Sequence, residues 1–450
     1  MTGSARARSR RALGLIVVML TVTLAVLWAQ REGPVETTES STEGAESSEP
    51  PPLCTRPGHS GGNSDRHLDA PYVILISFDG FRWDYPGRFE TPNFDRVAEA
   101  GTRAERLIPI FPTKTFPSHY SIATGMYAET HGLVGNRFWS AERDDVYSLG
   151  DREAVEDGSW YRGEPIWVTA ERQGMVSASF FFVGSEAAIG GVRPTYCRRF
   201  DAGIPNDDRV DGVLGWLRLP PRERPHVVTL YFGEVDRAGH DFGPDSEEMR
   251  AAIGIVDDAL GRLLDGIEAL PHGDKVNVVL VSDHGMMFVP AEANDLIDLS
   301  LLPGVRMEEG GPYASIFVEG DAQRKRNVRD SLAAMVPLNA VYLREEVPER
   351  FRYSTDPNIG DIVIIAAPGR QVRSADRAFR LRDFYNHGWD NLTPEMAGIL
   401  LAAGPQIAEG AVTGPTEAVH IYPLIAEILG LEPNPEIDGE LEAIKGFLRG

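Results

Sequence analysis

Short runs of apolar residues, each ending in polar or turn-forming residues, recur along the chain from residue 72 onward. The first, YVILISF at 72–78, is too short for a typical helix, is rich in β-branched residues and stops at Asp79-Gly80, so we expect a buried parallel strand. Similar runs lie at 176–183, 226–232, 276–282, 362–367 and 398–403, and amphipathic stretches such as 249–270 separate them. This alternation predicts an α/β fold in which helices flank a mostly parallel central sheet.

The first 70 residues have a different pattern. A basic run at 6–11 precedes an apolar stretch from 12 to about 29, which is typical of a signal peptide or signal anchor over residues 1–30. Its length lies between a signal-peptide core and a full membrane span, so cleavage and retention as an anchor both stay open. Residues 31–70 are rich in Glu, Ser, Thr, Pro and Gly, which predicts a disordered tether. We therefore expect an exported protein, periplasmic or extracellular, that is either released or anchored in a membrane.

The net charge and the cysteines bear on the class of ligand and on the cellular compartment. The 450 residues have a formal net charge of −23, which argues against polymeric nucleic acid as the main ligand, because that affinity comes from Lys and Arg neutralising phosphates. A small phosphate-bearing substrate remains compatible with this charge, since bound divalent metal ions can reverse the local field. The two cysteines, Cys54 and Cys197, either pair in an oxidising compartment or are unrelated thiols.

Polar residues follow several of the apolar runs, where a parallel sheet places its ligand site. Six of them are of types that bind zinc: Asp79, Asp236, His240, Asp283, His284 and His387. Six carboxylate and imidazole ligands are too many for one tetrahedral ion, but they suit two ions with three protein ligands each. We therefore expect a dinuclear catalytic site with two Zn²⁺.

Each of these residues has a plainer interpretation when it is taken alone. Asp79 fits a helix cap or turn, and His387 fits a structural histidine. Between Asp236 and His240, Gly239 favours a loop over a helix. An adjacent Asp-His pair directly after a strand, at 283–284, is harder to explain without solvent or a metal. It is the combination of the six residues that favours a metal centre.

A candidate nucleophile lies in the segment FPTKTFPSHYSIATG at 111–125. It offers Thr113, Thr115 and Ser118 in a proline-bracketed loop before a helix that we expect to begin near Ser118. A helix N-terminus attracts anions, and a metal-bound hydroxyl loses its proton near neutral pH, so a threonine here suits attack on phosphorus. The alternative is a capping loop without reactivity.

Several motifs together resemble one family. They are DGFRWDY at 79–85, PTKTFPSHYSIATGMYAETHGLVGN at 112–136, GEPIW at 163–167, YFGEVDRAGHDFGP at 231–244, VSDHGM at 281–286, HGWDN at 387–391, AAGP at 402–405 and PNPEIDG at 433–439. In this order they resemble the nucleotide pyrophosphatase/phosphodiesterase family of the alkaline phosphatase superfamily. The resemblance covers nearly the whole chain after the tether, and it implies an alkaline phosphatase-like core.

The resemblance also implies roles for individual residues. Its metal ligands fall in two sets: Asp236, His240 and His387 for one zinc, and Asp79, Asp283 and His284 for the other, with Thr115 next to the second ion as the nucleophile. The implied reaction is hydrolysis of phosphodiester or pyrophosphate bonds in nucleotides or related small molecules. It would proceed through a covalent phospho-threonine ester, with net retention at phosphorus.

Substrate-binding residues are implied less directly. Phe116 and Tyr231 match aromatic positions that sandwich a nucleobase in the family, Tyr196 is a third candidate, and all three also fit a hydrophobic core. Ser118 stands three residues after the nucleophile, where we expect the family to have an Asn that donates to a phosphate oxygen. A shorter donor at this position would reduce activity or alter the substrate.

Other functions remain compatible with this sequence. The same metal core could act on phosphomonoesters or lipid-derived choline phosphodiesters, because members of one superfamily differ in their pockets. A catalytically weak, tethered binding protein is the alternative from another class. For the organisation of the chain, we expect a catalytic domain over residues 71–440 with an insertion at approximately 290–380.

Overall fold

The computed structural model describes residue 54, residues 61–376 and residues 382–450. The predicted signal at 1–30 and most of the predicted tether therefore lie outside the described residues. Within the described part of the chain, no helix is long and apolar enough to cross a membrane.

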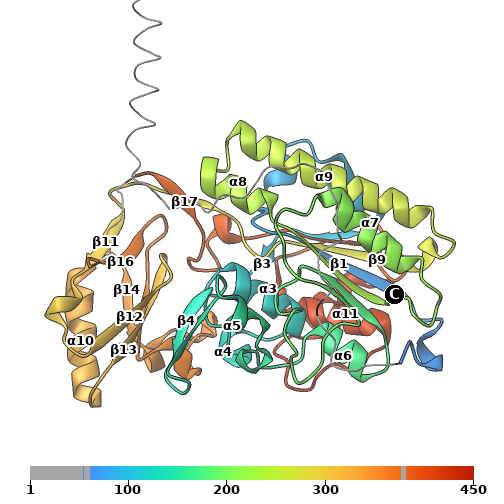
Figure 1. Ribbon diagram of the computed structural model, residues 1–450. Coiled ribbons are helices and arrows are strands. Elements are labelled where there is room, and N and C mark those ends of the chain that lie inside the picture. The colour runs from blue at the N-terminus through green and yellow to red at the C-terminus, as the bar shows by residue number, and fades with distance from the viewer. Residues whose placement is uncertain (1–53, 55–60, 377–381) are drawn as a thin grey trace, which may run out of the picture. The chain divides into compact units, whose positions relative to one another are not determined.

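An eight-stranded sheet forms the centre of the fold (Figure 1). From edge to edge its strands are β19 (Ala411–Thr413), β2 (Thr102–Ala104), β18 (Leu400–Ala403), β9 (Val276–Val281), β1 (Tyr72–Phe78), β8 (Val227–Phe232), β6 (Ser177–Phe180) and β7 (Tyr196–Arg198). The five strands from β9 to β7 run parallel, whereas β18 is antiparallel to both of its neighbours. The predicted mostly parallel sheet is confirmed, and four of its strands come from runs identified in the sequence after the first.

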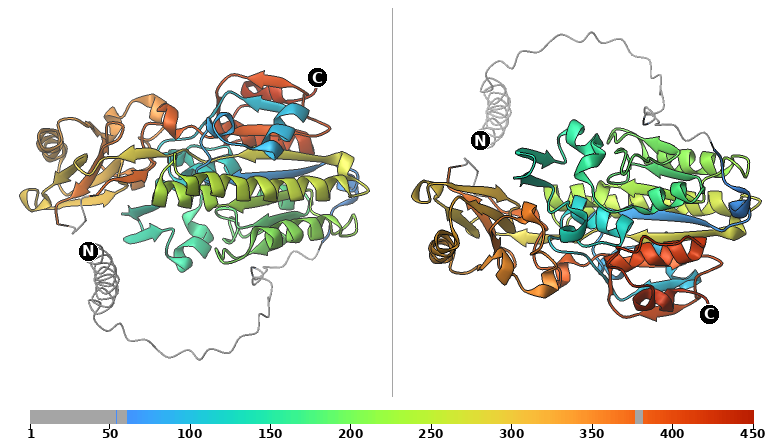
Figure 2. Two further views of the ribbon diagram at one scale, coloured as in Figure 1. Left: turned by 90° about the horizontal axis from the view of Figure 1, so that it is seen from above. Right: turned by 90° about the horizontal axis from the view of Figure 1, so that it is seen from below.

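Helices cover both faces of this sheet (Figure 2). One face carries α2 (Pro92–Ala100), α7 (Asn206–Leu217), α8 (Glu234–Phe242) and α9 (Glu247–Glu268). The other carries α3 (Thr115–Thr124), α6 (Ile166–Arg172) and α11 (Ile421–Leu429), with the short helices α4 (Ala128–His131), α5 (Arg152–Glu156) and α12 (Leu441–Ile444) further along the chain. In β1 the side chains alternate between the two cores: Ile74 and Ile76 pack on the α9 side, and Val73 and Leu75 on the α11 side. Because both faces of β1 are buried, its sequence is a nearly continuous apolar run without polar alternation.

A second sheet has its own hydrophobic core. Its order is β12 (Val305–Glu309), β13 (Tyr313–Val318), β15 (Ile362–Ile365) and β14 (Ala340–Leu343), all antiparallel, and α10 (Ala322–Met335) packs against it. Four two-stranded ribbons complete the strands: β10 (Met287–Val289) with β17 (Phe384–Asn386), β11 (Asn294–Ile297) with β16 (Gln371–Ser374), β4 (Arg137–Ser140) with β5 (Asp145–Ser148), and β3 (Leu107–Ile108) with β20 (Thr416–Glu417). We call the region from β10 to β17 the second lobe, which is yellow to orange in Figure 1.

The apolar run at 362–367 belongs to this second sheet and not to the central one. In β15, Ile362 and Ile364 face the core of the second lobe, whereas Val363 and Ile365 face the core around α11. Because both faces are covered, the strand has the same continuous apolar pattern as a central parallel strand.

The two cysteines are joined by a disulfide. Cys54 also donates its backbone N–H to the carbonyl of Cys197 at 3.1 Å, so residue 54 lies against the edge strand β7. The predicted tether is thereby attached to the folded part at a point before residue 61.

Candidate active site

The loops after three neighbouring strands bring the predicted ligands together. Asp79 follows β1, Asp236 and His240 follow β8, and the Asp-His pair at 283–284 follows β9. Gly80, with a φ of +70°, lets the first loop approach the second, since a Cβ at this position would lie 2.8 Å from the Cα of Asp236. The carboxyl ends of adjacent parallel strands therefore meet at one site, as the sequence predicts.

The loop expected around Gly239 is wrong. Residues 234–242 form helix α8, so Asp236 and His240 share one helical face, with His240 Nε2 3.5 Å from Asp236 Oδ1. A Cβ at Gly239 would lie 2.9 Å from Met286 Cε, so this glycine permits close packing of α8 against Met286 and does not interrupt the helix.

His387 arrives from the second lobe. It follows β17, and its ring stacks on that of His284 with centroids 3.4 Å apart. Its Nε2 lies 3.9 Å from Asp236 Oδ1. The position of this predicted ligand thus depends on how the β10–β17 ribbon is placed beside α8.

The three histidines are held in the state that a metal ligand requires. Each Nδ1 lies within hydrogen-bonding distance of a backbone carbonyl: His240 of Tyr385 at 2.9 Å, His284 of Gly285 at 2.9 Å and His387 of Thr113 at 2.8 Å. Since a carbonyl oxygen only accepts, each Nδ1 carries the proton and each Nε2 presents its lone pair to the carboxylates.

The carboxylates lack the donors that buried oxygens need. Asp79 Oδ1, Asp236 Oδ1 and Asp283 Oδ2 are buried and have no hydrogen-bond partner in the described residues. His284 Nε2 lies 3.4 Å from Asp79 Oδ1 and 3.1 Å from Asp283 Oδ2, but as a lone pair it cannot donate to them. Unpaired buried oxygens opposite imidazole lone pairs fit cations, and the mixed donor set suits zinc.

Burial and charge shift the titration of these groups. Burial, followed by the negative charges of neighbouring carboxylates, raises the pKa of Asp79 and of Asp283 well above the usual value. Burial, opposed by a backbone hydrogen bond, lowers the pKa of His284 well below the usual value, and burial with the charge of neighbouring histidines does the same for His387. The imidazoles of His284 and His387 are therefore neutral at pH 7, which is the ligand form.

By mutual distance, the tightest groups of ligand atoms differ from the predicted sets. Asp236, His284 and His387 form one, and Asp79, Asp283 and His119 form the other. His119 Nδ1 lies 2.8 Å from the carbonyl of Thr115 and 3.2 Å from Asp283 Oδ2, while its Nε2 lies 2.7 Å from Ser77 Oγ. Both ring nitrogens of His119 are thus engaged, so we assign it to orienting Thr115 and Asp283 and keep His284 in the second set.

We expect His119→Phe to lower kcat by about 10–100-fold and to weaken zinc binding, because it removes the imidazole that donates to the carbonyl of Thr115 and lies 3.2 Å from Asp283 Oδ2. His119→Asn keeps a donor near the Nδ1 position and should recover part of both. Zinc titration and steady-state kinetics measure these effects. His226→Phe is the control, since His226 is buried against Tyr72 outside the site. Wild-type zinc affinity and kcat in His119→Phe would contradict the assignment.

Thr115 is the first residue of α3, so the helix begins three residues earlier than expected. Its Oγ1 lies 3.3 Å from His284 Nε2, beside the second set of ligands. The ten-residue helix points its N-terminus, which favours negative charge, at the same place.

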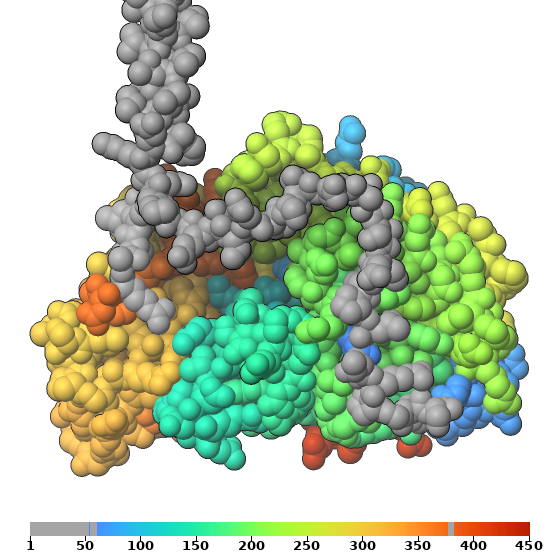
Figure 3. Space-filling model, viewed as in Figure 1, coloured from blue at the N-terminus to red at the C-terminus, as the bar shows by residue number. Residues whose placement is uncertain are grey.

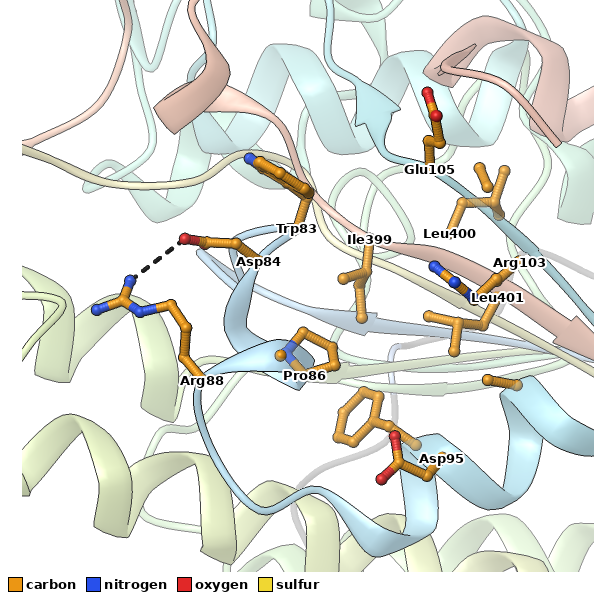
Figure 4. A pocket seen from close by; sticks show the side chains of 14 residues that line it. Trp83, Asp84, Pro86, Arg88, Asp95, Arg103, Glu105, Ile399, Leu400 and Leu401 are labelled. Atoms are coloured by element: carbon orange, nitrogen blue, oxygen red, sulfur yellow. Dashed lines mark hydrogen bonds and ion pairs between the residues drawn. The ribbon is translucent and has the colours of Figure 1, made fainter. Parts of the chain in front are cut away.

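A cavity of about 360 Å³ opens from Thr115. Phe116, Tyr231 and Phe200 line it, together with Asn136 and several ligands. Its mouth is part of the hollowed surface beside the teal segment that carries β4 and α5 (Figure 3). A larger cavity of about 570 Å³, with Trp83, Arg103 and Ile399 among its lining residues, contains none of the predicted site residues (Figure 4). The smaller cavity is therefore the candidate substrate site.

Of the four predicted substrate-binding residues, two line the cavity and two do not. Phe116 lines the cavity, and Tyr231 lines it while donating its hydroxyl to Asp79 Oδ2 at 2.6 Å. Tyr196 instead stacks on Trp216, with ring centroids 6.1 Å apart, and is not among the lining residues. Ser118 is fully buried and is also not among the lining residues.

Asn136 and Phe200 are among the lining residues that were not identified from the sequence. Asn136 accepts a hydrogen bond from the Phe116 backbone N–H at 2.9 Å, which leaves its amide nitrogen to donate to a ligand in the cavity. Asn136 thus supplies the side-chain amide donor that we expected the family to have at the position of Ser118. Phe200 is 46% exposed at the cavity wall. A lone Asn and a lone Phe in loops carry no local pattern, and only the fold brings them to Thr115.

A model of the type I phosphodiesterase / nucleotide pyrophosphatase family matches residues 73–390. The chain belongs to this family. It is 33% identical over 385 residues to the human ectonucleotide pyrophosphatase/phosphodiesterase family member 1, a match that covers 82% of this chain and 41% of that protein. The chain therefore spans about two fifths of the length of that relative. Human family member 7 is 32% identical over 398 residues, covering 84% of this chain and 83% of the relative.

Solved structures of the family share the fold. Murine ectonucleotide pyrophosphatase/phosphodiesterase 5 has a TM-score of 0.76 and 31% identity, and the match covers 84% of this chain and 100% of that one. An inactive variant of it, in which a threonine is replaced by alanine, was solved in complex with AMP and has a TM-score of 0.77. The family and the alkaline phosphatase-like fold expected from the motifs are confirmed.

Proposed function

We propose that the protein is an exported, zinc-dependent hydrolase that cleaves phosphodiester or pyrophosphate bonds in nucleotides or related small molecules through Thr115. One observation carries the proposal. The Thr115 hydroxyl lies at a helix N-terminus, 3.3 Å from a histidine lone pair and beside buried carboxylate oxygens without donors. The neutral histidines, the ionisable carboxylates and the hydroxyl together form a site for a metal-assisted attack on phosphorus.

The residues divide into two ligand sets. Asp236, His240 and His387 would hold one zinc, and Asp79, Asp283 and His284 the other. When bound, zinc lowers the pKa of an adjacent hydroxyl and neutralises charge on phosphoryl oxygens. Tyr231 donates to Asp79 Oδ2, and the Gly80 backbone N–H donates to Asp283 Oδ1 at 3.2 Å, so outer-shell groups hold both carboxylates of the second set.

The chain's own groups account for a double displacement. Thr115 Oγ1 loses its proton to solvent and forms a bond to phosphorus while the bond from phosphorus to the leaving oxygen breaks, and that oxygen keeps the electron pair. Asn136 and the N-terminus of α3 stabilise the negative phosphoryl oxygens. Water then hydrolyses the phospho-threonine ester and restores the hydroxyl. Loss of activity on replacing a threonine in the murine relative supports this role for Thr115.

Diesters suit the cavity better than monoesters. A monoester carries an additional negative charge that enzymes usually bind with a cation. Arg152 is the one Lys or Arg among the described lining residues, and it is paired with Glu156 at 2.9 Å and with Glu186. Lys114 is buried, donates to Asn386 Oδ1 at 3.2 Å and is not among the lining residues. The described cavity therefore offers a monoester dianion no unpaired Lys or Arg.

Export is supported by the disulfide, which forms in oxidising compartments. We propose that residues 1–30 direct this export, as a cleaved signal or as an anchor.

Zinc content measured together with hydrolysis of a chromogenic nucleotide diester and the matching monoester tests the proposal. We expect two zinc ions per chain and a preference for the diester. Preference for the monoester would overturn the substrate class, and a protein that stays inactive after zinc is added would favour the tethered binding protein.

We expect Phe200→Ala to raise KM for a nucleoside diester about tenfold, because a base stacked on an aromatic ring contributes on the order of 1–3 kcal/mol. KM for the p-nitrophenyl ester of ribose 5-phosphate, which has no base, should change much less. Leu338→Ala is the control, since Leu338 is also exposed, does not line the cavity and lies outside the β10–β17 ribbon. An equal rise for both substrates would indicate a general loss of site structure.

A further inference from the structure

A second cavity adjoins the first at the metal ligands. It has a volume of about 290 Å³ and shares Phe200, Tyr231, Asp236 and His240 with the substrate cavity. Thr115 lines only the first of the two. If phosphorus sits beside Thr115 and a base lies against Phe116, the second cavity remains for the other substituent on phosphorus, which is the leaving group.

The far end of this cavity is polar. Beyond the shared residues it is lined by Ala202, Gly233, Arg209, Glu234, Arg237 and Asp241. These side chains offer no large aliphatic surface for an acyl chain. They suit a charged or strongly polar leaving group instead.

The two arginines of this wall differ in their surroundings. The Arg209 side chain is 4% exposed, donates to the carbonyls of Ile204 and Tyr231, and faces Glu234 at 3.8 Å. Its charge is thus already offset. The exposed side chain of Arg237 makes no hydrogen bond or ion pair to another side chain in the described part of the chain. It lies on α8 next to Asp236, four residues before Asp241.

We propose that this second cavity receives the leaving group and that Arg237 selects leaving groups that carry phosphate. The inference rests on the proposed function. During cleavage of a pyrophosphate bond, the bond from Thr115 Oγ1 to phosphorus forms as the bond to the bridging oxygen breaks. The leaving phosphate keeps the electron pair and gains negative charge, which a guanidinium nearby stabilises. The favoured substrates are then nucleoside polyphosphates and dinucleotide pyrophosphates over lipid diesters.

The test compares two leaving groups on one nucleoside. With Arg237→Ala, kcat/KM for a nucleoside triphosphate, whose leaving group is pyrophosphate, should fall about tenfold. For the p-nitrophenyl ester of the nucleoside 5′-monophosphate, whose leaving group carries no phosphate, kcat/KM should change less than about twofold. Arg237→Lys should recover part of the loss. Arg262→Ala, at an exposed arginine paired with Asp211 on another helix, is the control.

Binding provides a readout without turnover. Pyrophosphate binding to zinc-loaded Thr115→Ala protein, measured by calorimetry, should weaken about tenfold when Arg237→Ala is added. An equal loss for both leaving groups, or unchanged pyrophosphate affinity, would overturn the proposal. A wild-type protein that hydrolyses neither the triphosphate nor the p-nitrophenyl ester would instead refute the proposed function. The pyrophosphate titration would still decide the role of Arg237.

Discussion

Replacing Thr115 with alanine should lower kcat for nucleotide diesters by about 10⁴-fold or more, because the reaction then lacks its nucleophile. Zinc content should stay close to that of the wild type, since all six Asp and His ligands remain. Steady-state kinetics and metal analysis on the same preparation measure both quantities.

Thr115→Ser provides the matched variant. It keeps a hydroxyl on the first residue of α3, so a substantial part of kcat should return, and a phosphorylated side chain should be trapped on Ser or Thr at this position by rapid acid quenching. Wild-type turnover in Thr115→Ala would remove Thr115 from the mechanism, because nothing else in the side chain could replace the lost oxygen.

Replacing Asp283 with asparagine should have effects of opposite sign on the metal-free and the zinc-loaded protein. Without zinc, the substitution removes one of several buried negative charges, and we expect the free energy of unfolding at pH 7 to rise by about 2 kcal/mol. With zinc, it removes a ligand, so zinc affinity should fall by about 10²-fold or more and activity should fall with it. Denaturant unfolding with and without chelator measures the change in sign. Asp69→Asn, at a fully exposed side chain, should change neither.

The dependence on pH follows from the same carboxylates. The pKa values of Asp79 and Asp283 are raised in the folded, metal-free protein, so above pH 4 the folded state binds more protons than the unfolded state. The stability of the metal-free wild type relative to metal-free Asp283→Asn should therefore fall as pH rises above 4, and zinc should remove most of this difference. The lowered pKa values of His284 and His387 act in the opposite direction, but they do so in both proteins. A stability difference that does not change with pH would show that Asp283 does not govern the dependence.

The strands and the ligand types were predictable from the sequence because their physical signals are local. An apolar run that stops at Asp79, or at Ser282-Asp283-His284, marks both the strand and the residues at its end. The sequence does not show which sheet a fully buried run joins, because β15 and β1 carry the same pattern.

The substrate cavity was less predictable, since its walls come from segments that are distant in the chain. Asn136 and Phe200 lie in separate loops, and His119 lies inside the helix of the nucleophile. Ser118 follows Thr115 by three residues, but it is fully buried on α3 and does not line the cavity. Spacing along the chain therefore indicated the candidate nucleophile but not the groups that line the cavity beside it.

The covalent link at β7 affects the unfolded chain more than the folded one. Cys54 and Cys197 are 143 residues apart, so the disulfide keeps Asp79, Thr115 and Asn136 within a closed ring when the protein unfolds. A ring of this size removes conformational entropy worth about 5 kcal/mol, which is comparable with the whole net stability of many domains. A cell that made this chain where thiols stay reduced would have to fold it without that contribution, so the compartment in which the protein folds also sets its stability.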